Sequence, residues 1–225
     1  MLTLPKFTKF QWLVHLGSLA PLALLIWDFF TDNLTANPIQ DVTFRTGKAA
    51  LVLLVLSLAC TPLNTLFGFR EALKVRRALG LYAFLYVCLH LSIFIGLDYG
   101  FDLELIREAI FEKRYALMGF AAFLILLPLA LTSTKGWMKR LGQNWKRLHR
   151  WVYLAAVLAV IHYVWGVKSD VREPLAYGAV VIVLLLARLP AVRRLASRAR
   201  QAYYRRTQPK PHPSPQRDGT PAPTD

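Results

Sequence analysis

The chain of 225 residues contains six long apolar runs, and their length constrains the fold more than any other feature of the sequence. A helix needs about 20 mostly apolar residues to cross a lipid bilayer. Charged residues are rare inside these runs and gather between them. We therefore expect an all-α integral membrane protein, a six-transmembrane-helix bundle, with spans at about 11–30, 47–67, 78–97, 115–133, 149–167 and 174–190.

The basic residues are unevenly divided between the two sides of such a bundle. With six spans, both termini and the second and fourth loops lie on one side, and that side holds 21 of the 28 Lys and Arg but three of the 13 acidic residues. An excess of Lys and Arg marks the cytoplasmic face. We therefore expect a multi-pass membrane protein with both termini cytoplasmic. In a bacterial cell it would lie in the inner (cytoplasmic) membrane, with the acidic loops in the periplasm. The net charge of +15 then reports topology, whereas a nucleic-acid-binding protein concentrates its basic residues on a folded soluble surface.

Composition divides the chain into three parts. Residues 1–10 form a cytoplasmic N-terminus, 11–190 the transmembrane bundle, and 191–225 a basic, proline-rich cytoplasmic tail that we expect to be disordered. His212 belongs to this tail and is expected to be inert. The segment 102–113 mixes apolar and charged residues and predicts a helix on the periplasmic surface, either as a membrane anchor or as a docking site for a partner.

Two histidines of the expected spans fall at the same depth. His90 lies late in the third span and His162 late in the fifth, and both spans start in the cytoplasm. Two imidazoles on facing parallel helices can hold a haem iron from above and below. We therefore expect His90 and His162 to be metal ligands at a periplasmic-side haem. A proton relay in a small transporter is the alternative from another class of protein.

His15 lies early in the first span and receives a different interpretation. A single histidine inside a membrane most often makes a hydrogen bond between helices, and we prefer that reading here. Contact with a quinone or with the carboxylate of a cofactor is the other interpretation.

A second group of candidate residues lies near the cytoplasmic side. His149 precedes His162 by thirteen residues, which is about 20 Å along a helix, and the step leaves the two rings about 140° apart around the axis. His149 must therefore lie on an unwound helix end or serve a site around the corner. On the third span, Arg76 shares a face with His90, and Arg77 follows it.

An arginine is a poor metal ligand but a good partner for a carboxylate or phosphate. The cytoplasmic site therefore holds a haem through His149 alone with Arg76 on a propionate, or binds a flavin phosphate, or is empty. Ordinary positive charge on the cytoplasmic side explains Arg76 and Arg77 equally well. Small residues on the third and fifth spans either leave room for a haem or allow close helix packing: they are Gly80, Ala83, Gly96, Ala155, Ala156 and Ala159.

Four stretches of the sequence are similar to a known family. The chain resembles the ferric-reductase-like transmembrane domain family and, within it, the MsrQ (YedZ) family of haem-binding membrane subunits, from about residue 10 to about 190. The family pattern has two histidines on the third helix and two on the fifth, and here one of the four positions is an arginine. The stretches are NPIQDVTFRTGKAAL (37–51), RRALGLYAFLYVCLHL (76–91), LALTSTKGWMKRLGQNWKRLHRWVYL (129–154) and IHYVWGVK (161–168).

The resemblance implies a function as well as a fold. It implies transmembrane electron transfer through one or two b-type haems, with FMN as a second cofactor. Electrons would come from the quinone pool or a cytosolic flavin reductase and pass to a periplasmic MsrP-like molybdopterin subunit, which repairs methionine sulfoxide in oxidised proteins. His90, His149 and His162 occupy the family's histidine positions. The resemblance also implies that the partner subunit, and not this chain, catalyses the reduction of methionine sulfoxide. A stand-alone ferric or cupric reductase is the second interpretation.

Overall fold

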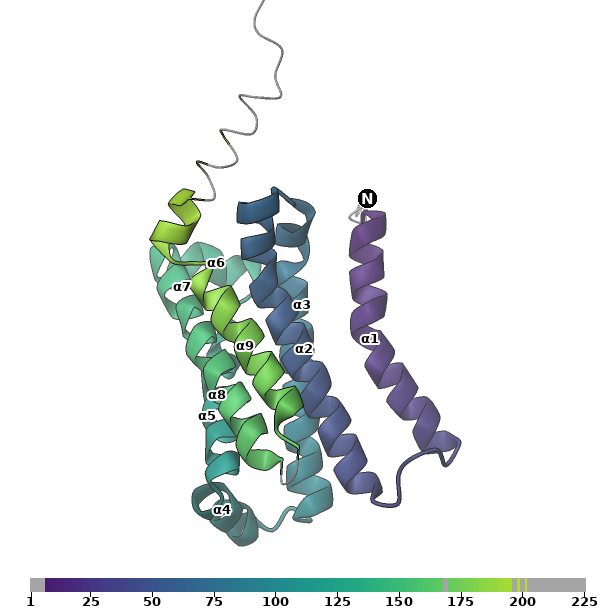
Figure 1. Ribbon diagram of the computed structural model, residues 1–225. Coiled ribbons are helices and arrows are strands. Elements are labelled where there is room, and N and C mark those ends of the chain that lie inside the picture. Colours follow the sequence, from purple (N-terminus) through teal and green to yellow (C-terminus); the bar gives the residue numbers. More distant parts are fainter. Residues whose placement is uncertain (1–6, 168–169, 196–197, 199–200, 202–225) are drawn as a thin grey trace, which may run out of the picture.

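The computed structural model describes residues 7–167, 170–195, 198 and 201, and all regular structure in these residues is helical. Figure 1 shows long helices that run side by side and short ones that cap the bundle. The α-helices are α1 (Lys9–Phe30), α2 (Pro38–Phe67), α3 (Glu71–Ile93), α4 (Leu103–Glu112), α5 (Arg114–Leu131), α6 (Lys135–Leu141), α7 (Gln143–Leu148), α8 (Val152–Gly166) and α9 (Arg172–Leu186). A π-helix, η1 (Phe94–Asp98), extends α3, and a 3-10 turn, η2 (His149–Trp151), joins α7 to α8.

Five helical segments of the described chain are long and apolar enough to cross a membrane. They are Lys9–Phe30, Pro38–Phe67, Glu71–Asp98, Arg114–Leu131 and Gln143–Gly166. The helical membrane protein expected from the apolar runs is confirmed at this level. The sixth expected span is α9, which has 15 residues and is therefore about 22 Å long, shorter than the other five. Six spans and cytoplasmic termini stay predictions.

The bundle has two ends, which we call the α6 end and the α4 end. The α6 end holds α6, α7, the start of α1 and the end of α9, whereas the α4 end holds α4 and the loop between α1 and α2 (Figure 1). Long helices that follow one another in the chain run in opposite directions between these ends. All the loops that we expect on the cytoplasmic side therefore lie together at the α6 end.

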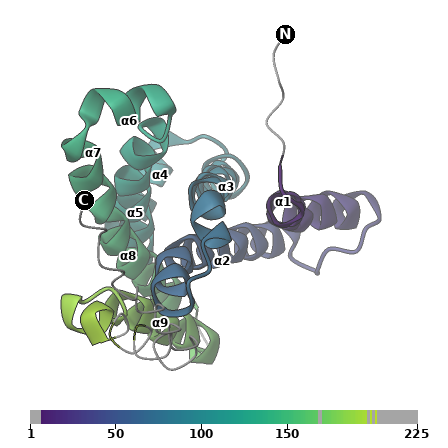
Figure 2. The ribbon, with the colours of Figure 1, turned by 90° about the horizontal axis from the view of Figure 1, so that it is seen from above.

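Two helical hairpins form the centre of the bundle. α2 packs against α3, and α5 packs against α8, while α9 covers α8 and α2. Seen from above, α1 stands apart from α5 and α8 and contacts α3 and α2 (Figure 2). The core where the hairpins meet consists of small and branched side chains, among them Leu51, Leu54, Leu58, Val75, Leu79, Ala83, Leu126, Ala155 and Ala156.

Tyr86 of α3 connects α1 to the rest of the bundle. Its side chain is 1% exposed, and its hydroxyl accepts a hydrogen bond from Leu22 N at 3.0 Å and donates one to Ser18 O at 2.9 Å. Pro21 lies in the same turn and removes one backbone donor from the helix. A proline and an inserted side chain are known causes of helix bending, and α1 bends along its length in Figure 1.

α2 begins nine residues before the expected start at residue 47. Asn37 caps the helix through Gln40 N, and Pro38 occupies the first turn, where a missing N–H costs nothing. Arg45 then pairs with Asp41 at 3.0 Å and with Asp28 of α1. These charged residues are helical because they neutralise one another, which hydropathy alone does not reveal.

The helix expected at 102–113 is confirmed as α4. Asp102 caps it by accepting hydrogen bonds from Glu104 N and Leu105 N at 2.9 and 3.1 Å. One face, with Ile106, packs into the protein, whereas Leu103 is 81% exposed.

The chain after α9 is only partly described. Residues 190–195 are helical, and Pro190 stands at the first position of that turn, where its fixed φ suits a helix. This helical turn differs from the disorder that we expect from residue 191 onward, and that expectation stays a prediction for the tail. His212 and the rest of the tail lie outside the described residues.

Candidate haem-ligand site

His90 of α3 and His162 of α8 face each other across the two central hairpins. Their ring centroids are 5.9 Å apart, and the ring planes are nearly perpendicular, at 86°. Two imidazoles on opposite sides of one metal ion have centroids about 6 Å apart, because each metal–nitrogen bond is about 2 Å long. The expectation that these two rings lie at one depth is confirmed, while their binding of a metal stays a prediction.

Each ring is oriented by a backbone carbonyl of the partner helix in its hairpin. His90 Nδ1 lies 3.0 Å from Thr43 O on α2, and His162 Nδ1 lies 2.7 Å from Tyr115 O on α5. Because a carbonyl only accepts, Nδ1 carries the proton in both rings. Nε2 is then unprotonated and has a free lone pair, which is the form of imidazole that ligates a metal.

Two glycines provide the space that the rings occupy. A Cβ at Gly47 would lie 3.2 Å from His90 Nδ1 and Cε1. A Cβ at Gly119 would lie 2.7 Å from His162 Nδ1 and 2.8 Å from Cε1, closer than real Cβ contacts come. Only glycine therefore lets His162 reach the Tyr115 carbonyl in this position.

The two hairpins repeat the same arrangement with the same spacing. In each, the carbonyl residue precedes its histidine by 47 residues and the glycine precedes it by 43. A shift of 72 residues converts Thr43, Gly47 and His90 into Tyr115, Gly119 and His162. The carbonyl and the glycine are one helical turn apart, so they lie on the same face and receive the ring together. The pair of histidines is thus a feature of an internal repeat.

Both histidines line one cavity of about 550 Å³. Its walls come from α2, α3, α5 and α8 and are mostly apolar, with Val87, Leu126 and Ala159 among them. Ala83 and Ala159 line it as expected for residues that leave room, whereas Ala155 and Ala156 are fully buried between helices. Its charged residues are Lys48, Asp98 and Lys113. The described residues contain no group of three or more His, Cys, Asp and Glu side chains that could hold a metal. A metal ion in this cavity would therefore have the two histidines as its protein ligands.

His149 lies outside this cavity. It begins η2, so the helix is irregular at this point, which is the first of the two alternatives that the thirteen-residue step leaves open. Its ring stacks on Trp145 at 3.9 Å, its Nδ1 donates to Trp145 O at 3.1 Å, and its Nε2 lies 3.4 Å from Ser133 Oγ. Local contacts on α7 and the end of α5 therefore hold the ring.

Arg76 and Arg77 point to different helices. Arg76 donates to Thr61 Oγ1 on α2 at 3.1 Å, and Arg77 contacts Met138 Sδ on α6 at 3.9 Å. The shift of 72 residues converts Arg77 into His149, so Arg77 rather than Arg76 occupies the position equivalent to that histidine. The structure therefore brings His90 and His162 together and leaves His149, Arg76 and Arg77 with separate partners.

His15 makes a hydrogen bond between helices, as expected for a single histidine inside a membrane. Its Nδ1 lies 2.9 Å from the Tyr82 hydroxyl on α3, and its ring packs edge-on against Tyr82. The two cysteines are free: Cys60 is buried and its thiol donates to Leu56 O.

Comparisons with known proteins agree on one relationship. The family described as "Ferric reductase like transmembrane component" matches residues 46–160. A protein-methionine-sulfoxide reductase heme-binding subunit MsrQ from Xanthomonas axonopodis pv. citri is 46% identical over 206 residues, which cover 88% of this chain and 92% of the relative. The subunit of the same name from Deinococcus radiodurans is 47% identical over 197 residues, covering 85% of this chain and 96% of the relative. No solved structure matches the chain.

The family match and the membrane helices support one another. The matched residues run from within α2 to within α8 and include Gly47, His90 and Gly119, whereas Thr43 and His162 lie just outside them. Together with the five membrane-length helices, they make this a multi-pass membrane protein. The chain belongs to the MsrQ family, within the ferric-reductase-like transmembrane proteins.

Proposed function

We propose that this chain is a membrane electron-transfer subunit that holds a b-type haem between His90 and His162. The observation that carries the proposal is the pair of rings 5.9 Å apart, each with its Nδ1 hydrogen-bonded to a backbone carbonyl and its Nε2 left free. A bis-histidine haem takes up and gives back one electron at a time. The relatives from Xanthomonas and Deinococcus are named heme-binding subunits, in agreement with this assignment.

The residues around the two rings suit a haem in size and in charge. The walls beside the rings are mostly apolar, and the cavity of about 550 Å³ extends to Lys48 and Lys113. The Lys113 ammonium donates a hydrogen bond to the Tyr99 hydroxyl at 2.7 Å, which raises the pKa of Lys113. Lys113 therefore stays cationic and would attract a propionate at this edge of the cavity.

Charge supports an orientation in which the α6 end is cytoplasmic. The loops and helix ends there carry most of the 28 Lys and Arg residues of the chain. We propose six spans in a bacterial inner membrane, with α9 as the sixth and with both termini in the cytoplasm. His90 and His162 would then deliver electrons toward the periplasm, where the acceptor would be an MsrP-like molybdopterin subunit that reduces methionine sulfoxide.

The entry point for electrons would lie at the α6 end, near His149. The donor would be quinol or a cytosolic flavin reductase, and FMN would be the second cofactor that the resemblance implies. Arg76 and Arg77 are the cationic side chains of α3 at this end that could hold a propionate or a flavin phosphate. Both lie at the same end of the bundle as η2, which contains His149.

A stand-alone ferric or cupric reductase is the second candidate, and the match to the ferric-reductase-like family favours it. The same haem would then reduce a metal chelate directly. The acceptor distinguishes the two proposals. Reoxidation of the reduced protein by a molybdopterin methionine sulfoxide reductase, but not by ferric or cupric chelates, would support the subunit role, and the reverse would support the reductase.

The spectrum of the purified full-length protein tests the haem proposal. We expect a Soret band, a pyridine haemochrome of the b type and a low-spin ferric signal in electron paramagnetic resonance. Haem and flavin per polypeptide, measured on the same sample, would decide how many cofactors bind. A chain that lacks a Soret band, and that takes up no haem on reconstitution, would rule out the proposal and favour a transporter.

A further inference from the structure

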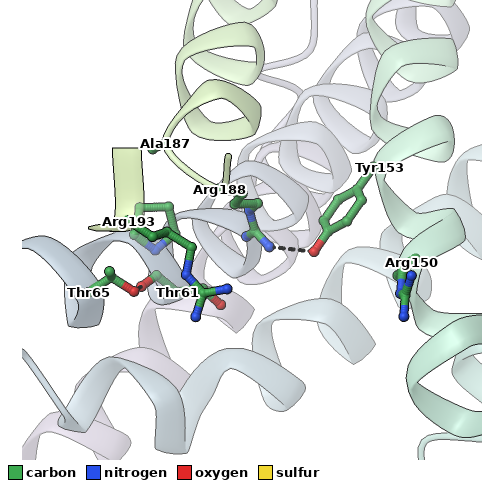
Figure 3. A pocket seen from close by; sticks show the side chains of 8 residues that line it. Thr61, Thr65, Arg150, Tyr153, Ala187, Arg188 and Arg193 are labelled. Atoms are coloured by element: carbon green, nitrogen blue, oxygen red, sulfur yellow. Dashed lines mark hydrogen bonds between the residues drawn. The ribbon is translucent and has the colours of Figure 1, made fainter. Parts of the chain in front are cut away.

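A second pocket, of about 350 Å³, opens at the α6 end among arginines. Three arginines line it: Arg150 from η2, Arg188 from the turn after α9, and Arg193 from the helical residues 190–195. The remaining lining residues are Thr61, Pro62, Thr65, Tyr153 and Ala187. In the view of Figure 3, Arg188 and Tyr153 lie between Arg193 on one side and Arg150 on the other.

Arg188 is held in place by the two helices beside it. Pro62 has no N–H to offer the carbonyl of Leu58 four residues earlier, so that carbonyl has no partner within α2. Arg188 Nη2 donates to this carbonyl, and its Nη1 donates to the Tyr153 hydroxyl at 2.8 Å (Figure 3). The Arg188 guanidinium also lies over the Tyr153 ring, 4.9 Å from its centroid. The cation is therefore fixed before any ligand arrives.

The positive charge of this pocket is not balanced by the described part of the chain. No acidic residue lines the pocket, and no described carboxylate forms an ion pair with Arg150, Arg188 or Arg193. Arg188 Nε is buried and has no hydrogen-bond partner among the residues that the structure describes. A buried donor of a charged group without a partner is costly, which points to a missing anionic acceptor.

We propose that this arginine pocket binds a phosphate group. Arginine guanidinium groups bind phosphate oxygens through paired hydrogen bonds, and the hydroxyls of Thr61 and Thr65 offer further polar contacts. The phosphate belongs either to the headgroup of an anionic phospholipid or to a soluble phosphate compound. Exposed apolar side chains at the same end, Leu63 and Leu189, suit a lipid whose chains lie against the bundle. The proposal does not depend on haem binding.

The test compares the full chain with a variant that removes two of the three arginines. Arg188 is left intact because it satisfies the Leu58 carbonyl, so the variant is Arg150→Gln with Arg193→Gln. The matched control is Arg140→Gln with Arg147→Gln, which removes the same charge from exposed positions at the same end that do not line the pocket. Melting temperature in phosphate-free buffer establishes that all three proteins are folded.

Two probes distinguish the source of the phosphate. The first probe is phosphatidylglycerol, titrated into delipidated protein in neutral detergent. Native mass spectrometry counts the lipid molecules bound per protein, and phosphatidylcholine is the neutral comparison. Inorganic phosphate, with chloride at equal ionic strength, is tested for a rise in melting temperature. We expect the pocket variant to bind the responding probe about 10-fold more weakly than the unaltered chain and the control variant, since charge-assisted hydrogen bonds are lost.

Either probe can support the proposal, and the probe that responds identifies the source. Binding of phosphatidylglycerol alone would identify a lipid headgroup, and stabilisation by inorganic phosphate alone would identify a soluble phosphate compound. The proposal is overturned if neither probe separates the unaltered chain from the pocket variant, or if the control variant loses as much binding as the pocket variant does.

Discussion

Replacing Gly119 by alanine is expected to weaken haem binding through the His162 ring alone. The new Cβ would lie 2.7 Å from His162 Nδ1. To restore an ordinary van der Waals contact, the ring would have to move by about 1 Å. The ring cannot move that far and keep its 2.7 Å hydrogen bond to Tyr115 O. The substitution therefore misaligns the Nε2 lone pair without removing the ligand.

The magnitude follows from the two contacts that change. Overpacking a close-packed site costs about 1–3 kcal/mol. Loss of the hydrogen bond to Tyr115 O adds about 1 kcal/mol. A total of about 2–4 kcal/mol corresponds to a fall in haem affinity of about 30- to 1000-fold.

Two other glycines provide a graded comparison. Alanine at Gly47 meets His90 at 3.2 Å, so a shift of a few tenths of an ångström suffices, and we expect a smaller loss of affinity than at Gly119. Alanine at Gly17 of α1 meets nothing within 4 Å and should bind haem as the unaltered chain does. The expected order of effect is therefore Gly119, then Gly47, then Gly17.

The assay measures haem per polypeptide after purification and haem affinity by titration of the apoprotein, with the low-spin signal recorded in parallel. A Gly119→Ala protein with unaltered haem content, affinity and spectrum would refute the reasoning, because the ring would then tolerate a contact that the geometry forbids. An effect at Gly17 as large as that at Gly119 would do the same.

Three further predictions concern the ligands, α1 and α4. His90→Ala and His162→Ala should each abolish the low-spin haem signal, whereas His149→Ala should retain it and alter only a second cofactor; a wild-type spectrum in either of the first two would contradict the pairing. Tyr86→Phe removes the hydroxyl that links Leu22 N and Ser18 O, two groups that can then pair with each other within α1. It should lower the free energy of unfolding by about 0.5–1.5 kcal/mol, measured by chemical denaturation in detergent, with no change expected in the haem spectrum. Asp102→Ala removes the cap of α4 at a cost of about 0.5–2 kcal/mol, which hydrogen exchange should detect as faster exchange confined to 103–112; protection equal to that of the unaltered chain would show that the cap contributes nothing.

Helical geometry explains why the ligand pair can be predicted from sequence and its surroundings cannot. A rise of about 1.5 Å per residue sets the depth of His90 and of His162 once the spans and their directions are known. The spacing of His149 predicts either an irregular helix or a site around the corner, and η2 shows that the helix is irregular there. Gly47 and Gly119, in contrast, give no local signal, because each is one glycine in an apolar helix and its function depends on a ring 43 residues away.

The direction of a side chain depends on packing between helices, which spacing along the sequence does not reveal. Arg76 does share a face with His90, and both turn toward α2, yet the residue equivalent to His149 is Arg77. The repeat that shows this equivalence has too few identical residues to be found without the hydrogen bonds that define it. Likewise, the start of α2 was placed late because Arg45 is neutralised by Asp28, a residue of another helix.

The sequence by itself determined the helical membrane class, the basic and acidic sides, the family and the depth of His90 and His162. The helical class, the two sides and the depth of the histidines depend on composition and on the fixed rise of a helix, whereas the family follows from the resemblance of four sequence stretches. The tertiary structure decided which carbonyls orient the two rings, which glycines make room for them, and where Arg188 forms a fixed cationic pocket. Those features are contacts between residues that lie far apart in the chain, and only the packing of the helices determines which of them meet.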